Sequence, residues 1–166
     1  MCCKVGDGGI ECQHWKTCGI ERDRMIDLIG EYRHKVDAKG RVALPAKFRK
    51  VLPTDLVVTV EPRKECLYVF ETEGFNEWID NFFKGEGGFD QRSKQETAIR
   101  RVLKSNGKDV EIDGSGRIII PAALREAVGI SKDVVLIGNT GHFEIWDADR
   151  WDEAKAEVDL SVLFID

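Results

Sequence analysis

The alternation of hydrophobic and polar residues predicts a set of short strands joined by tight turns. In residues 29–36, Tyr32, His34 and Val36 fall on one side of a strand, and charged side chains occupy the other. Runs rich in Val, Thr, Tyr and Phe, separated by short turns, predict two β-hairpins. Strands are therefore expected at 29–36, 42–44, 56–60, 66–70, 110–112, 118–120, 134–137 and 143–146.

Apolar residues at helical spacing predict two helices in the middle of the chain. The first, over 73–83, is expected to gather on one face Phe75, Trp78, Ile79, Phe82 and Phe83. The Gly-rich stretch from Gly85 to Gly88 ends that helix and is interpreted as a linker. A second helix, over 94–104, is expected to turn Ile99, Val102 and Leu103 inward.

Shorter helices are predicted where a proline follows a strand. Pro45 and Pro121 suit a first helical turn, because proline has a fixed φ and no N–H to lose there. A last helix is expected over 149–159. Short strands, hairpins and short helices together indicate the α+β class.

One short sequence pattern occurs twice. Asp37-Ala38-Lys39-Gly40-Arg41 recurs 76 positions later as Asp113-Gly114-Ser115-Gly116-Arg117. Each copy is followed by an apolar strand, a proline and a short helix that contains another arginine. The predicted hairpins also recur in the same order, which indicates an internal duplication with loops of slightly different length.

The length of the chain limits how the two repeats can fold. A chain of 166 residues can form one good core. A repeat of about 50 to 75 residues is near the lower limit for independent folding, so both are expected to share that core. We assign the first repeat to 25–100 and the second to 101–166. Residues 1–24 lack clear periodicity and are predicted to be a flexible N-terminal extension.

The charge distribution is more informative than the total. A net charge of −5 argues against a uniformly basic nucleic-acid binder. Residues 25–50, however, carry seven Lys and Arg against three acidic residues, and the acidic excess lies toward the C-terminus. The first copy of the repeated pattern therefore lies in a basic segment.

The cysteines allow one metal-binding interpretation. With His14, four cysteines crowd the extension: Cys2, Cys3, Cys12 and Cys18. Thiolate and imidazole suit zinc, but the spacing lacks paired C-x2-C elements and matches no familiar finger. The sequence therefore favours no metal and no cofactor, and Cys66 is expected to be a small buried hydrophobe.

Recognisable catalytic or membrane-spanning patterns are missing from the sequence. None of the three histidines lies in a nucleophile motif, and no glycine-rich phosphate loop is present. No apolar run approaches the ~20 residues that a membrane span needs, and no secretory leader is recognisable. The sequence therefore predicts a non-enzymatic protein of the cytoplasm.

The repeated arginines have two compatible interpretations. Asp37 and Arg41, and likewise Asp113 and Arg117, can meet across their turn and hold it, with Gly40 and Gly116 completing the turn. The same arginines can also present forked donors to phosphate or to guanine. Nearby Lys39, Arg33 and Lys35 favour an anionic partner. Arg49 and Arg125, at equivalent helix positions, are interpreted by default as solvated side chains.

From about Gly30 to Trp151 the sequence resembles the MraZ family of bacterial transcriptional regulators. The resemblance rests on the two D-x-x-x-R motifs, on Leu44-Pro45-Ala46-x-Phe48-Arg49 and Ile120-Pro121, and on Glu144-Ile145-Trp146-Asp147. It implies an internally duplicated, AbrB-like swapped-hairpin β-barrel with short helices. It also implies that Arg41 and Arg117 are the DNA-contact candidates.

The resemblance further implies a partner and an assembly. Family members form ring-shaped homo-oligomers and bind double-stranded DNA at regularly spaced direct repeats upstream of the division and cell-wall gene cluster, usually at their own promoter. A nucleoid-associated protein is therefore expected. Two alternatives stay open: an antitoxin-like or other protein-binding module on the same fold, and a metalloprotein that uses the N-terminal cysteines.

Overall fold

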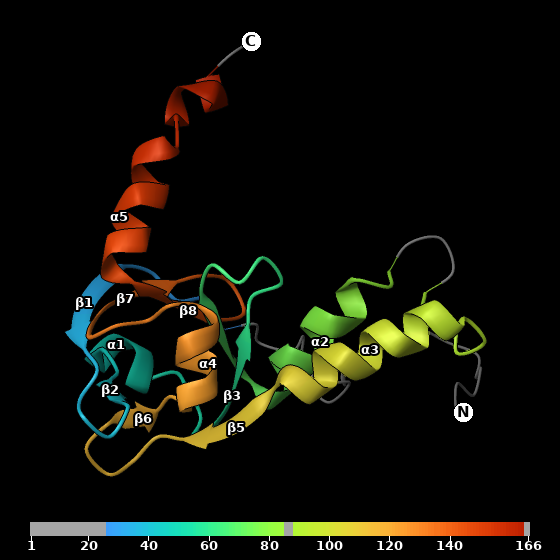
Figure 1. Cartoon of the computed structure of the whole chain (residues 1–166), viewed down its shortest axis with the longest axis horizontal. Helices are drawn as coiled ribbons and strands as arrows, with labels where there is room; N and C mark the ends of the chain where they lie inside the picture. The colour runs from blue at the N-terminus through green and yellow to red at the C-terminus, as the bar shows by residue number, and fades with distance from the viewer. Residues whose placement is uncertain (1–25, 85–87, 165–166) are drawn as a thin grey trace, which may run out of the picture.

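The computed structural model of the chain describes residues 26–84 and 88–164 (Figure 1). The predicted extension over 1–24, with its four cysteines and the zinc alternative, lies outside the described residues, as do Gly85 to Gly87 of the predicted linker. The strands are β1 (Glu31–Lys35), β2 (Arg41–Ala43), β3 (Asp55–Val60), β4 (Leu67–Glu71), β5 (Lys108–Glu111), β6 (Arg117–Ile119), β7 (Asp133–Gly138) and β8 (Phe143–Asp147). The helices are α1 (Ala46–Arg49), α2 (Thr72–Asn81), α3 (Lys94–Asn106), α4 (Ala122–Ala127) and α5 (Ala148–Glu157), followed by the 3-10 helix η1 (Leu160–Phe164).

Both predicted hairpins form and lie in one antiparallel sheet. The six strands are ordered β1-β7-β8-β4-β3-β5, so the hairpins β3–β4 and β7–β8 lie side by side at its centre. Each half of the chain then supplies an edge strand to the hairpin of the other half: β1 pairs with β7, and β5 pairs with β3. Every strand of the sheet consequently has a partner from the opposite half.

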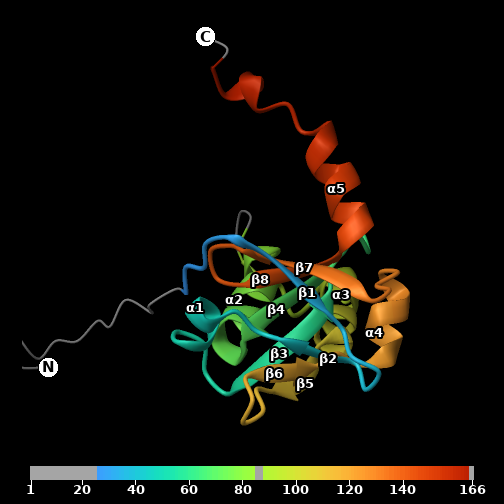
Figure 2. The ribbon, with the colours of Figure 1, turned by 90° about the vertical axis from the view of Figure 1, so that its left-hand side faces the viewer.

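The sheet is open in its hydrogen-bonded order. Among the described residues, β1 and β5 are its two edges and do not pair with each other. The structure is therefore a mixed α+β fold with an antiparallel sheet and short helices, and the closed barrel that we expected is not formed by these pairings. A separate ladder of two strands, β2 and β6, completes the β-structure beside the sheet (Figure 2).

The main hydrophobic core draws on both halves of the chain. Phe48 from α1 and Ile118 from β6 are fully buried in it, as are Val58, Leu136 and Ile145 of the large sheet. This burial is the principal source of stability, at about 1.5–3 kcal/mol for each large apolar side chain. Because both halves fill the same interior, they depend on each other for folding.

The two central helices pack less completely than the sequence predicts. Phe75, Ile79 and Phe83 form a small second core below α2, as expected, but Phe82 is 54% exposed. No residue of α3 is buried, and Ile99 and Val102 are 44% and 58% exposed. The prediction that Ile99 and Val102 point inward is therefore wrong, and of the three predicted residues of α3 only Leu103 packs against the second core.

The C-terminal helix α5 projects from the body of the molecule, at the end opposite to α2 and α3 (Figure 1). Two ion pairs connect it to β1, from Arg33 to Asp152 at 2.5 Å and from Lys155 to Glu31 at 2.7 Å. Beyond it, Val158, Leu160, Val162 and Leu163 are all 59% exposed or more. In the part of the chain that the structure describes, no helix is long and apolar enough to cross a membrane.

Candidate functional site

The first repeated motif forms a turn that its aspartate holds together. One carboxylate oxygen of Asp37 accepts the backbone N–H groups of Lys39 and Arg41, each at 2.9 Å. The other accepts the side-chain Nε–H of Arg41 at 2.6 Å. Gly40 donates its backbone N–H to the Asp37 carbonyl and adopts a φ of +79°, a conformation that glycine accepts without strain.

The second motif reproduces this geometry. Asp113 accepts the backbone N–H groups of Ser115 and Arg117 at 2.8 and 3.0 Å, and the Nε–H of Arg117 at 3.0 Å. Gly116 has a φ of +74°. The sequence interpretation that each aspartate meets its arginine across the turn is therefore confirmed.

Both aspartates keep their charge at neutral pH. The backbone N–H of Arg41, and after it the Arg41 guanidinium, hold the pKa of Asp37 below its ordinary value despite some burial. The N–H groups of Arg117 and Ser115 lower the pKa of Asp113 in the same way. Each arginine is thus oriented by an ionised partner through its Nε alone. Among the described residues, the terminal guanidinium nitrogens of Arg41 and Arg117 contact no protein acceptor, so they remain available to a ligand.

The two arginines project from the same face of the β2–β6 ladder. Arg41 pairs with Ile119 and Ala43 pairs with Arg117, while Val42 and Ile118 between them are fully buried. Because side chains alternate across a strand, the four outer positions share one exposed face. Along the ladder Arg41 and Arg117 are offset by two residues, or about 7 Å. The result is a two-stranded ribbon with two arginines and Ile119, 56% exposed, on its outer face.

Arg49 is exposed, as expected by default, and Arg125 is half-buried, but both side chains also pack against the motif turns. Three side-chain atoms of Arg49 occupy the space that a Cβ at Gly116 would need, its Nη1 lying 2.6 Å from that point. On the other side, Nη2 of Arg125 lies 3.1 Å from the equivalent point at Gly40. Each arginine therefore covers the motif turn of the opposite repeat. Their recurrence at a spacing of 76 residues was the only sequence signal for this arrangement.

Arg33 and Lys35, the other predicted DNA-binding residues, lie on β1 and not on the ribbon. Arg33 binds Asp152, and Lys35 binds Asp133 at 2.5 Å. Acidic residues therefore compensate both charges locally. Lys39 belongs to the first motif turn and is exposed, without a side-chain partner among the described residues. The structure thus places Arg41 and Arg117 on one face of the ribbon, with Lys39 in the turn that precedes Arg41, and leaves Arg33 and Lys35 on β1.

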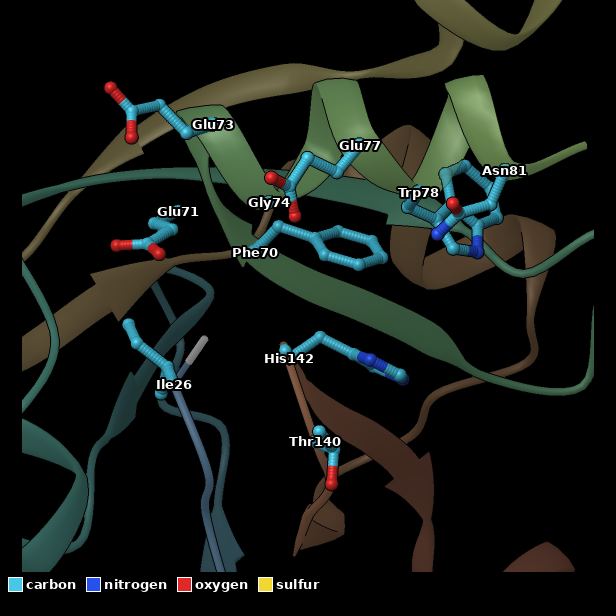
Figure 3. Close-up of a pocket in the computed structure, with 11 residues that line it drawn as sticks. Ile26, Phe70, Glu71, Glu73, Gly74, Glu77, Trp78, Asn81, Thr140 and His142 are labelled. Carbon is cyan, nitrogen blue, oxygen red and sulfur yellow. The ribbon is translucent and has the colours of Figure 1, made fainter. Parts of the chain in front are cut away.

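A hollow of about 140 Å³ lies between α2 and the β7–β8 loop (Figure 3). Its lining combines Glu71, Glu73 and Glu77 with aromatic rings, among them Trp78 and His142. Carboxylates repel phosphate, so this hollow is electrostatically unsuited to nucleic acid.

Metal and thiol chemistry receive no support from the described residues. Within 26–84 and 88–164, no cluster of three or more His, Cys, Asp or Glu side chains could hold a metal ion. Cys66 is buried, and burial raises the pKa of its thiol, which keeps the sulfur protonated.

Fold and site together define an α+β protein that carries an arginine-bearing two-stranded ribbon on its surface. The sequence profile of the MraZ family, whose description suggests an antitoxin-like role, matches residues 28–99 and 105–162. The chain belongs to the MraZ family. Its relatives are transcriptional regulators, not enzymes.

Individual relatives cover most of this chain. A transcriptional regulator MraZ of Thermoanaerobacter sp. strain X514 is 40% identical over 134 residues, which is 81% of this chain and 90% of the relative. The protein of the same name from Symbiobacterium thermophilum is 39% identical over 130 residues, 78% and 91% of the two chains. That from Lachnoclostridium phytofermentans is 36% identical over 125 residues, 75% and 84%.

Proposed function

We propose that this protein is a sequence-specific regulator that inserts its β2–β6 ribbon into the major groove of double-stranded DNA. The observation that carries the proposal is the shared outer face of the ribbon, where aspartates fix Arg41 and Arg117 by Nε and leave their forked ends available. The major groove admits a two-stranded ribbon, and a forked arginine matches the O6 and N7 acceptors of guanine.

The spacing of the two arginines agrees with this geometry. An offset of about 7 Å corresponds to about two base-pair steps of 3.4 Å. Ile119, exposed on the same face, supplies an apolar surface of the kind that contacts a thymine methyl group. Lys39 would add charge beside the groove. Arg33 and Lys35 stay weaker candidates, because their ion pairs with Asp152 and Asp133 would have to open first.

We further propose that the fold is a duplicated, AbrB-like swapped-hairpin arrangement. The support is that β1, β2, β5 and β6 all pair with strands of the opposite half. The targets would be direct repeats upstream of the division and cell-wall gene cluster, including the protein's own promoter. This assignment places the protein in the cytoplasm, on the nucleoid.

We also propose that the protein assembles into rings through its two ends. Helix α3 carries four basic residues and one acidic residue beside exposed Ile99 and Val102. The arm formed by α5 and η1 carries five acidic and two basic residues beside four exposed apolar side chains. Opposite charge and exposed apolar surface at opposite ends favour a head-to-tail contact between copies, which closes into a ring or continues as a filament.

Fluorescence anisotropy on the protein's own upstream DNA, against a scrambled sequence, tests the DNA proposal. We expect preferential binding to the native sequence. Arg41→Ala and Arg117→Ala should each weaken it by about 1–3 kcal/mol, because each removes a base contact. The same salt-sensitive affinity for both DNAs would reduce the proposal to phosphate attraction.

The antitoxin-like alternative makes a different prediction. The family description favours it in part, and it requires a protein partner instead of DNA. Absence of binding to either DNA, together with copurification of a small protein partner in stoichiometric amount, would replace the regulator by a protein-binding module.

A further inference from the structure

Arg49 and Arg125 lie outside the repeated motifs, yet the side chain of each packs against the turn of one motif. Arg49 leaves the short helix α1 of the first repeat and packs over Gly116 in the turn of the second. Arg125 leaves α4 of the second repeat and packs over Gly40 in the turn of the first, where its Nε also donates to the Ile120 carbonyl at 3.2 Å. Figure 2 shows α1 and α4 on either side of the ribbon.

Within the described part of the chain, Arg49 and Arg125 lack the carboxylate partners that several other basic residues of the surface have. Arg33, Lys35 and Arg100 each bind a carboxylate at 2.5 Å. Neither Arg49 nor Arg125 has an ion-pair partner among residues 26–84 and 88–164. Their charges are therefore held in place by packing and remain uncompensated.

Their position relative to the ribbon determines what they can reach. In the antiparallel ladder, the first turn precedes Arg41 at one end and the second precedes Arg117 at the other. The major groove is about 12 Å wide and bounded by phosphates on both sides. A ribbon seated in that groove brings its two ends, and the arginines that cover them, toward these phosphate rows.

We infer that the binding surface consists of two composite sites, each combining arginines from both repeats: Arg117 with Arg49, and Arg41 with Arg125. In each site the motif arginine reads a base and the helix arginine holds the adjacent phosphate. Arg49 and Arg125 are thus further DNA-binding residues. This assignment rests on the proposed DNA-binding function and adds a specific pairing to it.

The first test uses the whole protein in anisotropy titrations on native and scrambled upstream DNA across a salt series. Arg49→Ala should weaken binding to both DNAs by a similar factor, about tenfold at low salt, and lower the salt slope by about 1. The preference for native DNA should persist, because phosphate contacts position the protein without reading sequence. Arg49→Lys should restore most of the salt slope.

A double-mutant cycle tests the pairing itself. Arg49→Ala combined with Arg117→Ala should cost less than the product of the two single effects, because both belong to one site. Arg49→Ala combined with Arg41→Ala should cost the full product, since these residues belong to different sites. A purely structural role of Arg49 would change the thermal unfolding midpoint and would not reproduce this pattern.

The outcomes separate this inference from the function on which it rests. If the unaltered protein prefers native DNA but Arg49→Ala and Arg125→Ala leave affinity and salt slope unchanged, the composite sites are refuted and the regulator remains. Equal coupling of Arg49 to Arg41 and to Arg117 refutes the pairing. Absence of DNA binding by the unaltered protein overturns both proposals.

Discussion

Two features of the structure favour glycine at the positions of Gly40 and Gly116. Only the first concerns the backbone conformation. Their φ values of +79° and +74° disfavour any side chain with a Cβ. In addition, Arg49 fills the space where a Cβ of Gly116 would lie, and Arg125 and the Ile120 carbonyl crowd the equivalent point at Gly40, each at 3.1 Å. Each motif glycine therefore permits the backbone conformation of its own turn and leaves room for the arginine that packs on it.

Replacing Gly116 should accordingly cost more than a backbone change alone. We expect Gly116→Ala to lower the free energy of unfolding by at least the ~1–2 kcal/mol of a left-handed L-residue, because Arg49 must also move. Gly114→Ala, two residues earlier, is the matched control, since its Cβ would meet nothing within 4 Å. Urea unfolding of both variants measures the difference. A control change beyond about 0.5 kcal/mol would contradict this explanation.

At the scale of elements, the sequence predicted what local chemistry determines. The D-x-x-x-R turns, the prolines before α1 and α4, and both hairpins depend on neighbours within a few residues, and all were predicted. The packing of Arg49 on Gly116 joins positions far apart in sequence, which become neighbours only because the halves exchange strands. No local pattern encodes that contact.

Helix α3 shows the converse case, in which a local apolar pattern is present but does not correspond to a buried face. Its apolar residues recur at a helical period, and this period indicates a buried face only when a second surface is present. In this structure α3 contacts α2 through Leu103, the pair between Arg100 and Asp80, and a hydrogen bond from Lys104 to Asn76. Periodicity alone does not distinguish an apolar stripe that faces the core from one that stays exposed.

The exposure of α3 makes a testable contrast with α2. Val102→Ala should change the free energy of unfolding by less than about 0.5 kcal/mol in dilute protein, because Val102 is 58% exposed. Ile79→Ala, on the fully buried face of α2, should cost about 2–5 kcal/mol. Chemical denaturation of the two variants measures both values. Similar costs would mean that α3 packs more tightly than described.

At the scale of the whole molecule, the proposed head-to-tail contact between α3 and the arm formed by α5 and η1 can be tested by exchanging charges between them. Arg101 on α3 and Glu153 on α5 are both exposed, and neither has an ion-pair partner among the described residues. We expect Arg101→Glu or Glu153→Arg alone to reduce the assembled mass measured by light scattering, and the double variant to recover part of it.

The control for the charge exchange lies away from both ends. Arg63→Glu, in the exposed turn between β3 and β4, makes the same charge change and should leave the mass unaltered. A mass that responds equally to Arg63→Glu would point to net charge, and not to contact between α3 and the arm, as the cause. Unchanged mass in every variant would remove these surfaces from the assembly.

The fusion of both repeats into one chain also gives the molecule a direction. Two identical subunits must present the same turn twice, related by a two-fold axis. Here the turns have diverged: one carries Lys39 and the other Ser115, and the outer face of the ribbon has Ala43 in one strand and Ile119 in the other. If the ribbon reads DNA as we propose, its two ends are chemically distinct. Target sites that all point the same way suit it better than mirror-image halves.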